Sequence, residues 1–231
     1  MAVQLYGFRF SVYVRIARIT LAEKGIAYTL HEVNPFAADV PADYVGMHPF
    51  QRVPTLVHDG FILYETAAIT RYLDEAFEGP TLQPTAARQR ARMAQITGII
   101  DNYGYWPMVR QVFSHSVFRP RIGAPANQAE IDAGVAATER VLTAIEAVSV
   151  QSGYLLGTSP TLADIHLAPM ISCLDAAPEG HAVLARHERL SEWWEVVRER
   201  RSVVATEPGT PGPELHLNLP TGTAPICDGH H

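Results

Sequence analysis

The sequence predicts an α/β domain followed by an all-helical domain, and three observations support this fold class. Residues 3–33 read as strand, helix and strand, which is a parallel βαβ unit. Asp59-Gly60 joins two short apolar runs and is a good hairpin signal. After residues 77–84, a segment with two prolines and a glycine, strand signals nearly vanish. We therefore expect domains at residues 1–78 and 87–207, a linker at 79–86 and a C-terminal tail at 208–231.

The first domain opens with a strand at residues 3–6, which alternates in polarity and stops at Gly7. A helix follows from Ser11, a residue type that caps helix N-termini, to Gly25, which suits a C-terminal stop. A second strand is expected at residues 27–33. Because a helical crossover joins them, the two strands should pair in parallel within one sheet.

The remainder of this domain is organised around a proline. Residues 34–49 predict an irregular segment with one short helix at 39–47. Since Pro54 cannot donate a ladder hydrogen bond, it must stand at the start or edge of its strand. The hairpin then leads into a helix at 65–76, whose first-turn N–H groups favour an anion. This corner predicts a carboxylate or phosphate site beside a backbone edge.

The second domain is predicted from its helical periodicity. A long helix over residues 85–117 should present one apolar face, formed by Met93, Ile96, Ile100 and Tyr103. Pro107 inside this helix should kink or restart it. Thr161 and Asp164 form a capping-box pattern at the start of another helix. The other expected helices span residues 127–150, 161–174 and 189–204.

Composition narrows the classes of function. Of the 231 residues, 47% are hydrophobic and 18% are charged, the profile of a packed globular protein. A net charge of -6 without a basic run argues against a nucleic-acid partner. We find no apolar stretch near the ~20 residues that span a bilayer and no leader at Met1, so we expect a cytoplasmic protein. The two cysteines and scattered histidines lack metal-site spacing, and we expect no metal.

Four motifs in this order resemble the glutathione S-transferase superfamily. They lie at residues 11–15 with 23–26, 53–56, 63–69 with 71–73, and 161–164. The resemblance covers roughly residues 1–205. It implies a thioredoxin-like first domain and an all-helical second domain in a cytosolic homodimer. It further implies a serine-type enzyme of a bacterial or fungal-like class that uses glutathione as co-substrate, without a metal, in detoxification.

The resemblance raises the question of which group activates the glutathione thiol. A thiol pKa near ~8.5 leaves only a few per cent thiolate at neutral pH, and lowering it by ~2 units requires about 2.7 kcal/mol. A hydroxyl at a helix N-terminus can contribute both a hydrogen bond and the helix dipole. Ser11 is placed for this role, although it could also only cap its helix. Tyr6, at the end of the first strand, is the competing hydroxyl, or else a buried aromatic.

The same resemblance assigns the tripeptide's other contacts. Glu65 and Thr66 resemble the γ-glutamyl site, with Glu65 facing the ammonium and Thr66 the carboxylate. Pro54 would be cis, which leaves the N–H and C=O of Val53 to pair with the cysteinyl part. Gln51 and Arg52 stand where the glycyl carboxylate needs a donor, although either could be a solvated loop residue.

Residues of the long helix complete the predicted site. Asp101 resembles the acidic residue that crosses the dimer interface to the partner's γ-glutamyl ammonium, although it could be a solvated helix residue. An aromatic set with one cation could form the electrophile pocket, and some of its members could instead be core. This set comprises Phe10, Tyr13, Tyr105, Trp106, Arg110 and Phe113. It would suit an apolar electrophile, or one that also carries an acidic group.

The leading hypothesis is therefore a glutathione transferase that adds the thiolate, stabilised by Ser11, to a small hydrophobic electrophile. No cysteine lies near Ser11, which argues against mixed-disulfide chemistry. One alternative is a glutathione-dependent isomerase, dehalogenase or epoxide-opening enzyme of a metabolic pathway. Another is a non-catalytic binding module that keeps the fold.

Overall fold

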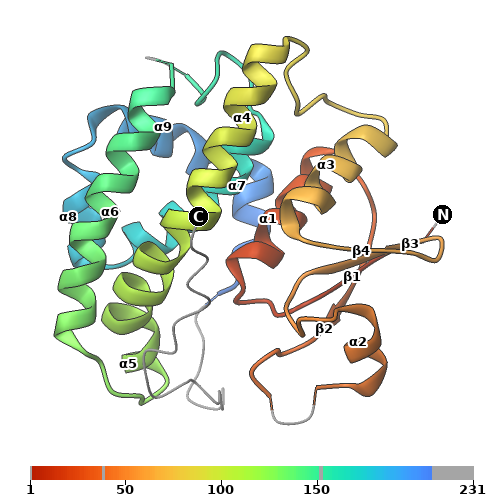
Figure 1. The fold of residues 1–231 in the computed structure, drawn as a ribbon, viewed down its shortest axis with the longest axis horizontal. Coiled ribbons are helices and arrows are strands. Elements are labelled where there is room, and N and C mark those ends of the chain that lie inside the picture. Colours follow the sequence, from red (N-terminus) through yellow and green to blue (C-terminus); the bar gives the residue numbers. More distant parts are fainter. Residues whose placement is uncertain (1, 38–39, 151–152, 210–231) are drawn as a thin grey trace.

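The computed structural model describes residues 2–37, 40–150 and 153–209. A small four-stranded sheet lies beside a larger group of helices (Figure 1). Helices α1 (Val12–Glu23) and α3 (Thr66–Ala76) cover one face of the sheet, and α2 (Ala42–Met47) lies on the other. The thioredoxin-like α/β domain and the helical domain predicted from the sequence are both confirmed.

The sheet has the strand order β2-β1-β3-β4. Its strands are β1 (Val3–Gly7), β2 (Thr29–Glu32), β3 (Thr55–His58) and β4 (Phe61–Tyr64). The parallel pairing of β1 and β2 follows from the α1 crossover, whereas β1–β3 and β3–β4 are antiparallel. Asp59 and Gly60, with φ of 49° and 85°, make the tight turn between β3 and β4, as predicted.

Local capping sets the ends of α1. Ser11 has extended backbone, and its Oγ accepts a hydrogen bond from Val14 N at 3.4 Å. Gly25, with a φ of 66°, ends the helix in a conformation that favours glycine. Both boundary signals in the sequence are confirmed. The second predicted strand is shorter than expected, because only residues 29–32 pair with β1.

The helical part contains one long helical path and several shorter elements. The path runs through α4 (Ala87–Ile99), two π-helical segments, η1 (Ile100–Gly104) and η2 (Trp106–Phe118), and the single turn α5 (Arg119–Arg121). The others are α6 (Gln128–Val148), α7 (Leu162–Asp175), α8 (Pro178–Leu184), α9 (Glu188–Arg198) and α10 (Arg201–Ala205). Helix α8 was not predicted from the sequence, and the single helix predicted at 189–204 is two separate helices, α9 and α10.

The π-helical turns correct one prediction. Met93, Ile96 and Ile100 are buried as expected, but Tyr103 is 67% exposed. From Ile100 onward each turn holds more residues than an α-helical turn, so the 3.6-residue spacing no longer identifies the inner face. Met108, rather than Tyr103, continues the buried side. Pro107 lies in the first turn of η2, where its missing N–H is tolerated.

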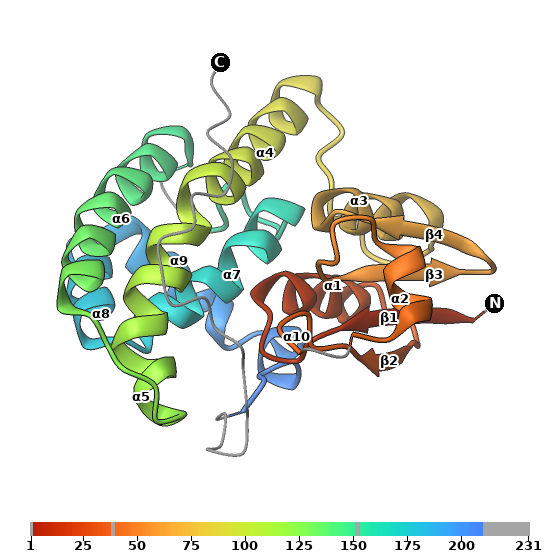
Figure 2. The same cartoon turned by 60° about the horizontal axis from the view of Figure 1, so that its bottom comes forward.

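Helix α1 packs into two hydrophobic clusters. Its Val14, Ala17 and Leu21 join the cluster that includes Leu5, Leu56 and Ile69, between the sheet and α3. Its Val12, Ile16 and Ile19 join the larger cluster of the helical part. Figure 2 shows α1 between the sheet and α7. This central position ties the residues at the start of α1 to both halves of the molecule.

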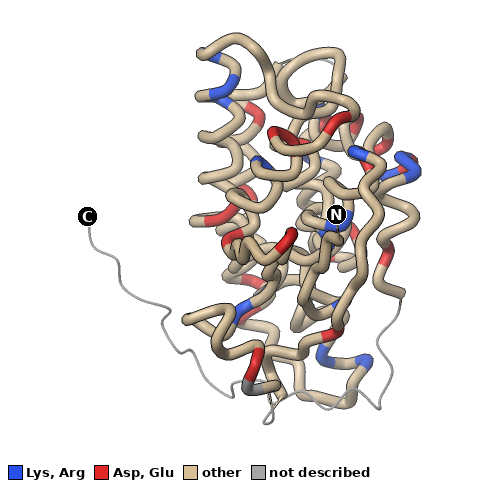
Figure 3. The backbone as a smooth tube through the Cα atoms, turned by 90° about the vertical axis from the view of Figure 1, so that its right-hand side faces the viewer, with Lys and Arg blue, Asp and Glu red and all other residues tan. Residues whose placement is uncertain are grey.

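The charged positions are mixed along the described chain. Figure 3 shows Lys and Arg scattered among Asp and Glu. Of the helices in the part that the structure describes, none combines the length and apolar character needed to cross a membrane.

Candidate functional site

Three predicted site segments meet at one edge of the sheet. In the antiparallel register, Tyr6 of β1 pairs with Thr55 of β3, and Thr55 pairs with Tyr64 of β4. The segment that leads from β1 to Ser11, the Val53–Pro54 segment before β3 and the Glu65–Thr66 segment after β4 therefore leave the sheet at the same edge. Segments far apart in sequence are thus placed side by side by strand pairing alone.

Ser11 stands at the N-terminus of α1 and is partly accessible. Its oxygen accepts the long hydrogen bond from Val14 N, and its proton is free to donate to an acceptor outside the helix. The positive end of the helix dipole lies at the same point. An anion placed here would meet both favourable interactions.

The Tyr6 side chain contacts Gln4 and His31. It donates to Gln4 Oε1 at 3.1 Å, and its ring stacks on His31 with centroids 4.5 Å apart. The ring centroid of Tyr44, a residue of α2, lies 6.1 Å from that of Tyr6. Tyr6 therefore packs on the face of the sheet that α2 covers, whereas α1 covers the opposite face.

The Val53–Pro54 peptide bond is cis, as the resemblance implied. Within the described residues, the N–H and C=O of Val53 make no hydrogen bond, so this backbone edge is open. Tyr44 holds the segment from behind, because its hydroxyl donates to Arg52 O at 2.5 Å and lies 3.0 Å from Thr55 Oγ1. Gln51 and Arg52 are exposed beside this edge.

Glu65 and Thr66 form the start of α3. Glu65 has a φ of 70°, in the left-handed region that non-glycine residues seldom occupy, and its side chain is exposed. Thr66 is buried, and its hydroxyl has no hydrogen-bond partner among the described residues. The first-turn N–H groups of α3 are unpaired within the helix, so this corner can accept a carboxylate.

Asp101 contacts a buried histidine of its own chain. Its Oδ1 lies 2.8 Å from Nε2 of His166, a residue of α7 that is 1% exposed. Burial, the Asp101 carboxylate and the nearby Tyr105 and Glu65 together raise the pKa of Tyr13. Tyr13 also packs against Tyr105, with ring centroids 5.0 Å apart. His166 is not among the site residues predicted from the sequence, since only the fold brings α7 against η1.

The other residues of the predicted electrophile pocket fall in an aromatic cluster between the two halves of the chain. Phe10 and Phe113 both contact Phe118, each with ring centroids 6.3 Å apart. The guanidinium of Arg110 lies 5.7 Å from the ring centre of Phe36 and 6.0 Å from that of Trp106. Three members that the sequence analysis missed are Phe8, Phe36 and Phe118. We use the name inter-domain aromatic cluster for the six aromatic residues in these contacts, which are Phe8, Phe10, Phe36, Trp106, Phe113 and Phe118.

The thiol of Cys173 in α7 favours its protonated form. Burial raises the pKa of its thiol to about 12, although Arg15 nearby acts in the opposite direction. A buried thiol of this kind stays protonated at neutral pH. Cys227 lies outside the described residues. Among the residues described, no group of three or more His, Cys, Asp and Glu side chains could hold a metal ion.

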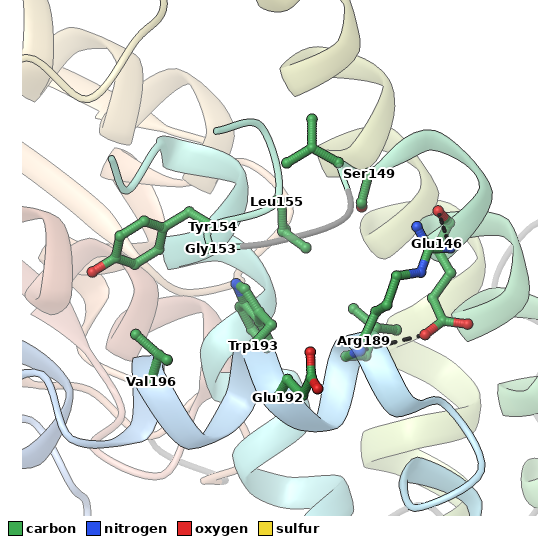
Figure 4. Close-up of a pocket in the computed structure, with 11 residues that line it drawn as sticks. Glu146, Ser149, Gly153, Tyr154, Leu155, Arg189, Glu192, Trp193 and Val196 are labelled. Atoms are coloured by element: carbon green, nitrogen blue, oxygen red, sulfur yellow. Dashed lines mark hydrogen bonds between the residues drawn. The ribbon is translucent and has the colours of Figure 1, made fainter. Parts of the chain in front are cut away.

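Two cavities lie outside this corner. A groove of about 550 Å³ between α3 and α4 is lined by Thr70, Arg71, Met93, Gly98 and Asp101, among others. A cavity of about 190 Å³ lies between α9 and residues 153–155, next to the end of α6 (Figure 4). There Arg189 donates to the carbonyl oxygen of Glu146 at 2.8 Å. None of the predicted site residues lines this smaller cavity.

Comparison with known proteins gives a consistent result. The family model of the glutathione S-transferase N-terminal domain matches residues 5–81, and that of the C-terminal domain matches residues 128–195. The chain is 26% identical to glutathione S-transferase 3 of Zea mays over 213 residues, covering 91% of this chain and 95% of that protein. It is 31% identical to a stringent starvation protein A homolog of Coxiella burnetii over 170 residues, covering 72% of this chain and 73% of that protein.

The fold gives the same match. A solved structure of glutathione S-transferase III in its apo form superposes with a TM-score of 0.80 at 26% identity, covering 92% of this chain and 99% of that one.

Proposed function

The chain belongs to the glutathione S-transferase family of enzymes, and from this premise we propose that it is a serine-type transferase in which Ser11 stabilises the glutathione thiolate. The observation that carries this proposal is the convergence of Ser11, Val53 and Thr66 at one edge of the sheet. Each offers an unpaired polar group of the kind that one part of the tripeptide needs.

The tripeptide would lie along the open edge. Val53 would pair with the cysteinyl backbone through its free N–H and C=O, and Thr66 with the α3 first turn would bind the γ-glutamyl carboxylate. Glu65 would face the ammonium, while Gln51 or Arg52 would reach the glycyl carboxylate. These contacts leave the sulfur near the N-terminus of α1. The hydrogen bond from the Tyr6 hydroxyl to Gln4 supports Ser11 over Tyr6 as the hydroxyl that meets the sulfur.

The reaction would follow from this placement. The thiol proton leaves to solvent, and the Ser11 hydroxyl and the helix dipole stabilise the thiolate that remains. The sulfur then attacks an electrophile held against the inter-domain aromatic cluster, which includes Phe10 and Trp106. Holding both reactants together contributes to the rate in addition to the thiolate stabilisation.

The Ser11→Ala variant tests this assignment. Losing a hydrogen bond to a charged atom costs about 1.5–3 kcal/mol, so kcat/KM with a chloro-dinitrobenzene should fall about 10- to 150-fold. The affinity for glutathione should stay nearly the same, and the pKa of the bound thiol, followed by ultraviolet absorbance, should rise. Ser11→Thr is the control, because it keeps both a hydroxyl and a helix cap. Unchanged turnover in Ser11→Ala would show that the serine assignment is wrong.

Two alternatives stay open to experiment. If glutathione is required but never appears in the product, the reaction is an isomerisation or a reductive dehalogenation. The other alternative is a non-catalytic binding module that keeps the fold. Lack of retention on immobilised glutathione, together with no activity on chloro-nitrobenzenes, would support that reading.

We also propose a cytoplasmic homodimer that acts in detoxification. The groove between α3 and α4 supports the dimer, since small residues such as Ala67, Ala94 and Gly98 allow close approach of a second chain. Asp101 lies in this groove, where it could approach the partner's glutathione. Sedimentation equilibrium would measure the assembly, and a monomer at micromolar concentration would contradict it. The bacterial or fungal-like class stays a prediction, because the similar proteins include a maize enzyme.

A further inference from the structure

Arg110 differs from Arg15 and Arg200, two other arginines that are at least half-buried, in what it contacts. Arg15 donates to the Glu207 carboxylate at 2.5 Å, and Arg200 donates to the Glu23 carboxylate at 2.6 Å. Arg110 is half-buried, yet no carboxylate pairs with it among the described residues. Its guanidinium instead lies against the rings of Phe36 and Trp106. A partly desolvated cation without a counter-charge attracts an anion more strongly than a solvated one.

Tyr105 adds a second donor beside Arg110. Burial raises the pKa of Tyr105, and Arg110 and Arg52 only partly offset this effect, so the phenol stays protonated at neutral pH. Arg110 is near enough to Tyr105 to lower the pKa of its phenol, and a protonated phenol can donate its hydrogen to another group. The guanidinium and the phenol together can therefore bind one carboxylate.

This pair of donors is linked to the reacting centre through ring contacts. Phe10 precedes Ser11 in the chain and packs on Phe8, with ring centroids 5.4 Å apart. Phe8 contacts Phe36, and Phe36 contacts Arg110. An electrophile seated on these rings would have apolar surface on one side and the Arg110 guanidinium at one end. A molecule that is both aromatic and acidic matches this arrangement.

We propose that Arg110 determines substrate specificity by binding a carboxylate on the electrophile, so that this transferase prefers aromatic acids over neutral aromatic electrophiles. The inference rests on the proposed function. The reaction is a substitution: the glutathione sulfur forms a bond to the ring carbon, the carbon–chlorine bond breaks, and chloride leaves with the bonding electrons. The thiol proton goes to solvent, and the carboxylate of the electrophile takes no part in the bond changes.

A matched pair of substrates tests the proposal. Chloronitrobenzoate and its methyl ester have the same ring and leaving group and differ in charge. In Arg110→Met, kcat/KM for the acid should fall about tenfold or more, because a hydrogen bond to a charged group is lost, while the ester should change little. Arg110→Lys should recover part of the activity with the acid, since it keeps the charge but not the planar fork.

The main competing occupant is the glycyl carboxylate of glutathione. Arg52→Met serves as the matched control, because Arg52 is the residue proposed to bind that carboxylate. We expect Arg52→Met to raise KM for glutathione and to leave the ratio of acid to ester activity unchanged. A rise in KM for glutathione in Arg110→Met, with equal loss for acid and ester, would overturn the proposal. An equal loss for both substrates without that rise would indicate a structural role and would overturn it as well.

A binding measurement separates this inference from the proposed function. Nitrobenzoate has no leaving group, so its affinity, measured by calorimetry with glutathione present, does not depend on catalysis. If the wild-type protein conjugates neither substrate but binds nitrobenzoate about tenfold more tightly than Arg110→Met does, the proposed function fails and the Arg110 site stands. If the two affinities are equal, the Arg110 site is wrong, whether or not the protein is a transferase.

Discussion

Among the residues that the structure describes, each half of the molecule buries one carboxylate, and the two are stabilised by different kinds of partner. Asp74 of α3 pairs with Lys24 Nζ at 3.2 Å and also accepts hydrogen bonds from Leu82 N and Gln83 Nε2. Asp164 of α7 has no cation partner among the described residues. It accepts instead from neutral donors, which are Leu155 N, the N–H and hydroxyl of Thr161, and Trp193 Nε1, at 2.7–2.8 Å.

The difference reflects what each carboxylate holds in place. Lys24 also donates to the carbonyls of Asp74 and Pro80, so the ion pair joins the end of α1 to α3 and to the segment that leads into the helical half. Asp164 completes the capping box at the start of α7 and fixes α9 through Trp193. The Lys24–Asp74 ion pair therefore holds α1, which begins after Ser11, against α3 within the sheet domain. The hydrogen bonds of Asp164 instead hold together α7, which carries His166, and α9.

The largest effect is expected from Asp164→Ala. The substitution leaves Leu155 N, Thr161 N and Trp193 Nε1 buried without an acceptor, and each unsatisfied donor costs about 1–3 kcal/mol. We expect a loss of about 4 kcal/mol or more in the free energy of unfolding, measured by urea denaturation. Asp164→Asn keeps the size and one acceptor and should lose less. A loss below about 1 kcal/mol would mean that the network does not hold α7.

A somewhat smaller loss is expected from Lys24→Met. It leaves the Asp74 carboxylate buried with two neutral donors, and breaking one side of a buried ion pair typically costs about 3–5 kcal/mol. We expect about 3 kcal/mol by the same measurement. The double variant Lys24→Met with Asp74→Leu should recover part of this loss, because no unpaired charge remains. Equal stability of the single and double variants would contradict an ion-pair role.

The smallest effect concerns Glu23, a partly buried carboxylate at the end of α1. Burial tends to raise its pKa, but hydrogen bonds from Arg200 and Ser202 outweigh burial, so the net pKa is lowered. A lowered pKa in the folded state stabilises the protein above the unfolded pKa of about 4.3, and this stabilisation is lost as the pH falls through the folded value. Glu23→Gln should therefore cost about 1 kcal/mol at neutral pH and nothing in strong acid.

Urea denaturation of the wild type and of Glu23→Gln, from neutral pH to about pH 2, measures this difference in the free energy of unfolding. Glu192→Gln is the matched control, because Glu192 is an exposed helix residue with no ion pair among the described residues. The control should match the wild type at every pH. A gap between wild type and Glu23→Gln that stays constant, or widens in acid, would contradict the assigned pairing with Arg200.

Local signals in the chain were enough to predict much of the fold. Ser11 as helix cap, Gly25 as helix stop, Asp59-Gly60 as turn and Thr161 with Asp164 as capping box all lie where the sequence placed them. Each acts through backbone groups within about four residues, so its outcome depends little on distant parts of the chain. The domain limits at 79–86 and the roles of the site residues stay predictions.

The rest required tertiary packing. Tyr103 is exposed because π-helical turns interrupt the α-helical period, and no local residue pattern predicts these turns. Arg110 against Phe36 and Asp101 against His166 join residues 74 and 65 positions apart. The sequence therefore predicts Ser11 and Thr66 as site residues from their positions at helix starts. The lack of a carboxylate partner for Arg110 among the described residues depends instead on how the two halves pack. Such contacts form only when the whole chain offsets the entropy of bringing distant segments together.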